Sequence, residues 1–229
     1  MIAKINTSIC RGYQSCYDAT FNSYNGYLYC YGYQSCEKIN VLSSSQIICN
    51  GGESCRYSDL IISSGFIKCD GSNSCRYSKN IISSGSYIYC GGDQGCRAAD
   101  LIQANEYIQC VGHQSCVSVD KLESNKYIEC SGDYSCNSVN LIKSQDYVKC
   151  TGYEACLGNN TIIESNSYVE CSSYQSCKYI KSIIANNYII CSGIESCKGK
   201  TNLTSINSYI ECSSTESCKD SNIYSGKLF

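Results

Sequence analysis

Twenty-two cysteines are the residues of this chain with the most evident chemistry. Five residues separate the two cysteines of each pair, and the first cysteine recurs about every 20 residues. Thiols at a regular spacing can oxidise to disulfides or hold a metal ion. The pairs are Cys10 and Cys16, Cys30 and Cys36, Cys49 and Cys55, Cys69 and Cys75, Cys90 and Cys96, Cys110 and Cys116, Cys130 and Cys136, Cys150 and Cys156, Cys171 and Cys177, Cys191 and Cys197, and Cys212 and Cys218.

Disulfides are the favoured chemistry. Structural zinc sites use closer knuckles such as C-x2-C and usually recruit histidine, whereas His113 is the only histidine and follows a glycine that we assign to a turn. If equivalent cysteines stack about 5 Å apart, they could also pair along the column. Each column holds eleven cysteines, so column pairing would leave a thiol over. We therefore predict one disulfide within each C-x5-C pair, and neither a metal nor a cofactor.

Two carboxylates form the strongest candidate for catalysis. Glu195 and Glu216 occupy equivalent positions in consecutive copies, and stacking would bring them about 5 Å apart, the separation of a retaining glycosidase. Other copies carry Gln at this position, so a solvated side-chain ladder is the favoured interpretation. We predict no enzymatic activity and assign no catalytic residue.

An aromatic column lies three positions before the first cysteine. Regularly spaced rings can stack on sugars or on a partner surface, and they also stabilise parallel sheets without any ligand. The candidate binding face consists of Tyr87, Tyr107, Tyr127, Tyr147, Tyr168, Tyr188 and Tyr209. Structural stabilisation is the favoured role.

Smaller charged groups also recur with the repeat. Glu129, Lys149 and Glu170 directly precede the first cysteine in consecutive copies, so we expect cross-strand ion pairs. A stripe of arginines directly follows the second cysteine, where it could meet an anionic glycan, although a solvated edge is favoured. These are Arg56, Arg76 and Arg97.

Composition indicates an oxidising compartment. So many cysteines are typical of disulfide scaffolds in secreted proteins, and N-glycosylation motifs occur at Asn6, Asn159 and Asn202. A net charge of −2 without a basic run argues against nucleic-acid binding. Because there is no run of about 18 apolar residues, we predict no membrane span. The first ten residues lack the apolar block of a secretion signal, which we expect upstream or removed.

The elements that position these residues follow from the columns of the repeat. An aliphatic residue stands two positions before nearly every first cysteine, as Ile108 does before Cys110, and this alternation predicts a short strand with both residues facing inward. Glycine or serine follows two positions after that cysteine, which predicts a corner. Apolar pairs such as Leu60 and Ile61 predict a second inward strand. Frequent Gly, Ser, Asn and β-branched residues weigh against helix.

Together the columns predict an all-β fold. We expect a single parallel β-solenoid domain over residues 1–229, with about eleven coils of about 20 residues and a length of roughly 50 Å. Leu, Ile, Val and Phe supply only about a fifth of the chain, so the disulfides must contribute what a larger core would. Each such small loop is worth about 2 kcal/mol in the chain-entropy estimate.

The C-x5-C coils, such as CRGYQSC and CSGDYSC, resemble those of the beetle antifreeze proteins. That resemblance implies a β-solenoid with each cysteine pair joined across the interior. Coils of that family are far shorter, and its ice-binding threonines are absent: the positions flanking the first cysteine hold, for example, Tyr29 and Tyr31, and the chain has only seven threonines. The resemblance therefore supports the scaffold and not ice binding.

These observations favour a structural, extracellular protein. Solenoids usually end in atypical caps, whereas this repeat runs from Cys10 to Cys218 with short tails. We expect either a segment of a longer array or a rigid rod that self-associates end to end into a filament or surface coat. The alternative is a module that binds glycans or a crystalline surface, including ice, through its repeated outer face.

Overall fold

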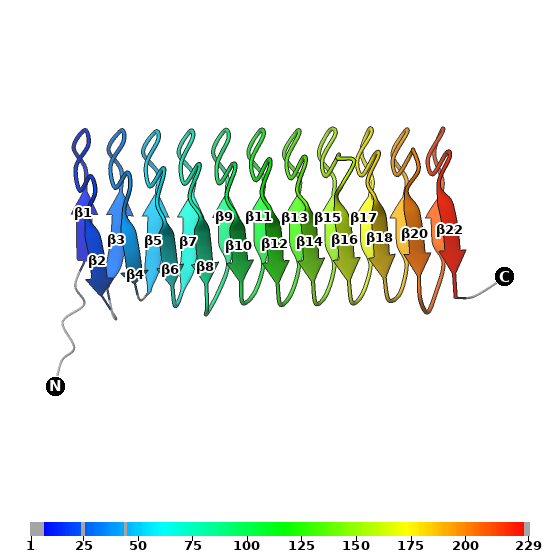
Figure 1. Ribbon diagram of the computed structural model, residues 1–229, viewed down its shortest axis with the longest axis horizontal. Coiled ribbons are helices and arrows are strands. Elements are labelled where there is room, and N and C mark those ends of the chain that lie inside the picture. The colour runs from blue at the N-terminus through cyan, green and yellow to red at the C-terminus, as the bar shows by residue number, and fades with distance from the viewer. Residues whose placement is uncertain (1–6, 24–25, 44, 227–229) are drawn as a thin grey trace.

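The computed structural model describes residues 7–23, 26–43 and 45–226, which wind into a β-solenoid of eleven stacked coils (Figure 1). Each coil contributes one short strand to each of two eleven-stranded parallel sheets. The predicted all-β fold class, the coil length and the disulfide in each coil are confirmed. No helix of the described residues is long and apolar enough to cross a membrane.

One sheet carries the first cysteine of every pair at the end of its strands, and we call it the cysteine sheet. It consists of β1 (Thr7–Cys10), β3 (Tyr27–Cys30), β5 (Gln46–Cys49), β7 (Phe66–Cys69), β9 (Ile88–Cys90), β11 (Ile108–Cys110), β13 (Ile128–Cys130), β15 (Val148–Cys150), β17 (Val169–Cys171), β19 (Ile189–Cys191) and β21 (Ile210–Cys212).

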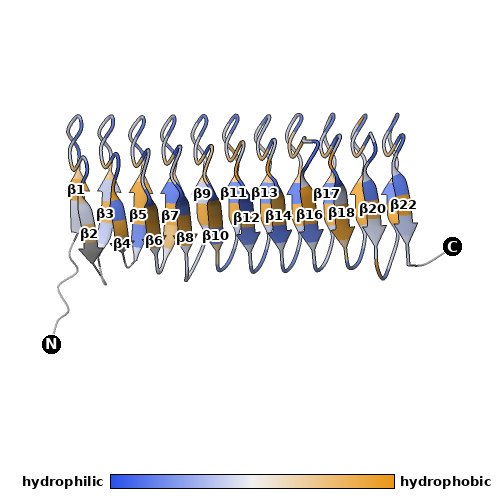
Figure 2. Ribbon diagram, in the orientation of Figure 1, coloured by the Kyte–Doolittle hydropathy of each residue, from blue (hydrophilic) through white to orange (hydrophobic). Residues whose placement is uncertain are grey.

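The other sheet, which we call the opposite sheet, contains the strand that follows each disulfide loop. It consists of β2 (Thr20–Ser23), β4 (Asn40–Ser43), β6 (Leu60–Ser63), β8 (Asn80–Ser83), β10 (Leu101–Ala104), β12 (Lys121–Ser124), β14 (Leu141–Ser144), β16 (Ile162–Ser165), β18 (Ser182–Ala185), β20 (Asn202–Ser205) and β22 (Asn222–Ser225). Figure 2 shows hydrophobic residues concentrated on strands such as β8 and β10.

The coils stack in strict register, so identical residues form columns. Ile108 and Cys110 pair with Ile128 and Cys130 of the next coil, and all four side chains are fully buried. In the opposite sheet only one residue of each apolar pair faces inward: Ile61 is fully buried, whereas the preceding residue is half-buried on the outer face. A narrow core of aliphatic side chains and disulfides therefore runs along the axis.

All eleven disulfides join the two cysteines of one C-x5-C pair, as predicted by counting. Their Cα atoms lie 5.9–6.1 Å apart, and no cysteine is free. Each bridge closes the loop between the cysteine sheet and the connection to the opposite sheet, and nearly all of the sulfur-bearing side chains are buried.

The chain bends two positions after the first cysteine in every coil, as predicted, and the glycine there also allows close stacking. A Cβ on Gly132 would lie 2.3 Å from the carbonyl oxygen of Gly112 in the preceding coil. Its φ is not in the left-handed region, and among the described glycines only Gly199 has such a φ, of +116°. Close stacking of the backbone therefore excludes a side chain at Gly132.

The unusual backbone of the coil lies elsewhere, at positions that sequence analysis did not identify. Four, six and eight residues after the first cysteine, non-glycine residues adopt left-handed φ, as at Gln114 (53°), Cys116 (53°) and Ser118 (57°). The amide of Gln114 donates to Asp133 of the following coil, and that of Cys116 donates to Gly95 of the preceding one. Hydrogen bonds between coils thus offset the cost of left-handed φ, which is about 1–2 kcal/mol per residue.

Candidate functional surfaces

The predicted tyrosine column is an unbroken stack of rings on the outer face of the cysteine sheet. From Phe66 to Tyr209, neighbouring ring centroids lie 4.7–5.6 Å apart with interplanar angles of 1–12°. The parallel strands supply this spacing, because each coil repeats the ring position of the one before. Each inner ring lies between two others, so its faces are covered and its edge and hydroxyl remain accessible.

Burial between neighbouring rings changes the acidity of these phenols. It raises the pKa of Tyr107, Tyr127 and Tyr188 above the ordinary value. The pKa of Tyr147 is raised furthest, first by burial and then by the negative charge of Glu129, whose carboxylate accepts the Tyr147 hydroxyl at 3.3 Å. The ladder therefore favours neutral phenols, and its stabilising effect falls as the pH rises above about 10.

The predicted charge alternation on the cysteine sheet is confirmed for one of its two pairs. Lys149 Nζ lies 3.4 Å from the Glu170 carboxylate of the next coil. Glu129 has other partners, since it accepts the Gln109 side-chain amide at 2.9 Å together with the Tyr147 hydroxyl. Both interactions connect neighbouring coils and offer no open site.

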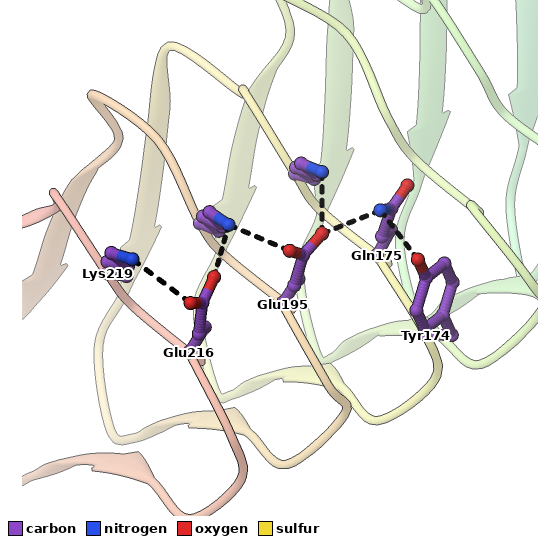
Figure 3. Close-up of polar contacts among 7 residues, drawn as sticks. Tyr174, Gln175, Glu195, Glu216 and Lys219 are labelled. Carbon is purple, nitrogen blue, oxygen red and sulfur yellow. Dashed lines mark hydrogen bonds and ion pairs between the residues drawn. The ribbon is translucent and has the colours of Figure 1, made fainter.

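A second ladder runs along the disulfide loops near the C-terminal end, and we call it the charge ladder (Figure 3). Glu195 accepts Lys178 and Lys198 at 2.7 Å each, and it also accepts the amide of Gln175 at 2.6 Å. These cross-coil hydrogen bonds agree with the side-chain ladder that the sequence predicts at this position. They also occur at the other end of the rod, where Gln34 donates to Glu53 at 2.9 Å.

The charge ladder continues to the last coil. Lys198 bridges Glu195 and Glu216, and Lys219 contacts the other oxygen of Glu216 at 3.0 Å. Hydrogen bonds from Lys178 and Lys198 lower the pKa of Glu195 to about 2, and those from Lys198 and Lys219 lower the pKa of Glu216. Because a glycosidase acid must hold a proton near neutral pH, this environment is opposite to the one that such catalysis requires.

The arginine stripe is also tied into the coil surface. Arg56 and Arg76 each lie 4.5 Å over the ring of the tyrosine that follows them. Arg97 donates to the side chain of Gln94 at 3.1 Å. All three arginines are half-buried, so their guanidinium groups already have partners on the protein.

His113 is an exposed turn residue. Its Nδ1 lies 3.0 Å from Asp93 of the preceding coil, and both side chains are about half exposed. Several groups of three cysteine sulfurs lie within 4.8 Å of one another, but every one of these cysteines is in a disulfide. Since zinc binds thiolates, these sulfur groups are not ready-made metal ligands.

Two of the three glycosylation motifs lie within the described residues, and Asn6 lies outside them. Asn159 is exposed in the connection between β15 and β16, and Asn202 is exposed on β20. Both line one surface cavity of about 940 Å³, which sequence analysis did not identify. Thr161, the threonine of the Asn159 motif, is almost fully buried.

The C-terminal coil exposes residues whose equivalents are buried in the coil before it. Ile223 of β22 is 50% exposed, whereas the equivalent Leu203 is fully buried, and Cys212 is exposed where Cys191 is buried. Within the described chain, β21 and β22 each pair on one side only. Among the described residues this end is therefore a partly apolar edge of both sheets.

The chain matches no known family model, no curated protein and no solved structure. No antifreeze homologue is identified. The chain is a β-solenoid with one disulfide in each coil, and its resemblance to the beetle proteins stays a prediction.

Proposed function

We propose that the protein is a secreted structural rod that stacks end to end into a filament or a coat at a cell surface. The observation that carries this proposal is the half-exposed Ile223, together with the one-sided pairing of β21 and β22 among the described residues. Exposed strand edges readily pair with strands of another chain. A head-to-tail contact between identical copies does not close on itself, so it builds fibres.

The columns of the repeat support this contact with specific partners. If β1 and β2 of a second copy continue the stack, Phe21 would cover Ile223. Gln14 would face Glu216, repeating the hydrogen bond seen between Gln175 and Glu195. Asp18 would face Asp220, and this like-charged pair would oppose the contact.

The disulfides support the proposed secretion, and the occupied outer face supports a mechanical role. Eleven disulfides persist only in an oxidising compartment, which agrees with a secreted protein. Stacked rings and ion pairs occupy much of the repeated outer face, so we propose a mechanical role without enzymatic activity. For glycan binding by the tyrosine column, which stays a prediction, ring edges and hydroxyls are the available contacts.

Electron microscopy of the non-reduced protein across a concentration series tests the proposal. We expect thin filaments of uniform width that lengthen with concentration. Ile223→Asp should abolish them, because it places a charge in the junction. Asp220→Asn should promote them by removing the like-charge contact.

Tyr224→Asp is the matched control, since Tyr224 neighbours Ile223 on β22 but faces outward, 59% exposed. This variant should still form filaments. Discrete rods of the unmodified protein at every concentration would contradict the proposal, as would an equal loss of assembly in both variants.

A further inference from the structure

The regular outline of the coils is broken in one region, around the disulfide loops before β16 and β20. Figure 1 shows the connection from β15 to β16 departing from the outline shared by the other connections. The cavity of about 940 Å³ lies here and spans four coils, where these loops lead into the opposite sheet. Three other surface hollows hold only about 160–220 Å³ each. Ligand pockets commonly hold about 300–1,000 Å³, so this cavity is large enough for a small oligosaccharide.

Two glycines leave one tyrosine ring of this region without a stacked neighbour. Eight residues after the first cysteine, the column reads Gly158, Tyr179 and Gly199 in consecutive coils. In the same column Tyr57 and Tyr77 stack on each other at 5.2 Å. Tyr179 is 47% exposed, lines the cavity and makes no ring–ring contact within the described residues.

Position 199 requires a glycine. A Cβ there would lie 2.7 Å from the Tyr179 ring, and its φ of +116° is one that other residues rarely adopt. The departure from the repeat is therefore built into the backbone at Gly199. Lys178 lies 4.9 Å over the Tyr179 ring, and the exposed part of the ring forms an aromatic surface at the cavity wall.

The polar groups around the ring are suited to an acidic ligand. Lys181 and Lys200 line the cavity, are exposed, and make no ion pair in the described part of the chain. In contrast, Lys178 is committed to Glu195 at 2.7 Å. Three carboxamides also line the cavity, and two of them are already linked, since Asn222 donates to Asn202 at 2.9 Å.

We propose that this cavity binds an anionic saccharide, one that carries carboxylate or sulfate groups. The Tyr179 ring stacks on the apolar face of a sugar ring, as aromatic platforms do. Lys181 and Lys200 pair with the acidic groups through charge-assisted hydrogen bonds. The carboxamides and Asp220 hydrogen-bond to hydroxyl groups. The protein carries a net charge of −2, so its overall charge does not attract anions.

The tyrosine and both lysines of the site lie in the two coils before the last one, whereas Asp220 and Asn222 belong to the coil of the proposed filament junction. Affinity is measured by isothermal titration of protein made without N-glycans, with an oligogalacturonate, a heparin-derived hexasaccharide and neutral chitotriose as probes. We expect saturable binding of at least one acidic probe and much weaker binding of chitotriose. The same result is expected for Ile223→Asp, so failure of assembly and failure of this site are distinguishable.

Matched variants test the residues. Tyr179→Ala should lower the affinity about tenfold, whereas Tyr77→Ala, from the same column with 40% exposure, should leave it unchanged. Replacing both lysines, Lys181→Gln with Lys200→Gln, should weaken binding about tenfold and reduce its salt dependence. Lys121→Gln, on β12 outside the cavity, should have no effect.

Three results would overturn the proposal. One is the absence of saturable binding of either acidic probe, and a second is equal binding of chitotriose. The third is N-glycosylation of Asn159 or Asn202 in the protein secreted from eukaryotic cells, which intact-mass and peptide analysis would show. A glycan attached to either residue would occupy the cavity and exclude the ligand.

Discussion

The serine directly before the second cysteine is a recurring buried residue, and its hydrogen bonds decide its contribution to the free energy of unfolding. Seven of these serines have no hydrogen-bond partner for their hydroxyl among the described residues: Ser15, Ser35, Ser54, Ser74, Ser115, Ser135 and Ser196. All seven belong to coils with glycine at the corner. Where the corner is Ser173, the hydroxyl of Ser176 donates to the Ser173 carbonyl at 2.9 Å and accepts its amide at 3.2 Å.

Replacing one of the unpaired serines should therefore stabilise the protein. We expect Ser115→Ala to raise the free energy of unfolding by about 1 kcal/mol, because a buried hydroxyl without a partner is removed. Ala155 already occupies the equivalent position. Ser176→Ala should instead lower stability by about 1 kcal/mol, since it breaks two hydrogen bonds. Denaturant unfolding with intact disulfides measures both, and equal effects of the same sign would contradict this account.

At the scale of the coil, the corner glycine sets how closely one turn stacks on the next. Gly132 donates its amide to Cys110 of the preceding coil at 3.3 Å, and the same bond recurs at Gly112 with Cys90. The corner at Ser173 accommodates a Cβ because its amide is directed to the Ser176 hydroxyl instead. A side chain at this corner thus requires a coordinated change in the coil.

Gly132→Ala should lower stability by about 2 kcal/mol or more, because its Cβ would lie 2.3 Å from the Gly112 carbonyl oxygen. Gly12→Ala is the matched control. Gly12 occupies the same corner in the first coil, where the nearest atom to its Cβ would be 3.7 Å away, so we expect a change within about 0.5 kcal/mol. Comparable melting-temperature losses in the two variants would show that stacking does not explain the glycine.

At the scale of the whole molecule, the rod is a one-dimensional stack in which each coil contacts mainly its two neighbours. Such arrays lose structure first where a neighbour is missing. The last coil lacks a neighbour on one side in the described chain, and the charge ladder from Lys178 to Lys219 links it to the two coils before it. Protonation of its carboxylates should therefore weaken this end before the middle.

We expect acid to release the C-terminal coils selectively. The pKa of Glu195 is lowered to about 2, so its contribution is complete above about pH 4.5 and is lost as the pH falls toward about 2. Hydrogen exchange, corrected for intrinsic rates, should show protection of β20 and β22 falling in this range while that of β11 persists. Because the pKa of Glu216 is lowered as well, Glu195→Gln should reduce the pH dependence without abolishing it. Glu123→Gln should leave the pH dependence unchanged, because Glu123 makes no ion pair among the described residues and the neighbouring Lys143 pairs with Glu164.

Much of this molecule follows from the sequence because the repeat is strict. The spacing of Ile108 and Cys110 determines a two-residue alternation, and its recurrence every 20 residues determines stacked parallel strands. The odd number of cysteines in each column determines the disulfide pairing. A column of identical residues has only one simple way to stack, so the tyrosine ladder follows as well.

Only the tertiary structure decided features that arise between coils or from departures from the repeat. Left-handed φ at Gln114 and Cys116 has no sequence signal, because neither residue type favours it and the compensating hydrogen bonds come from other coils. The alternating ion pairs of Glu195 and Glu216 depend on lysines from adjacent coils. The cavity beside Tyr179 exists because the coils on either side carry glycines, which have no side chains, at the equivalent position. The sequence of one coil does not specify what its neighbouring coils place beside it.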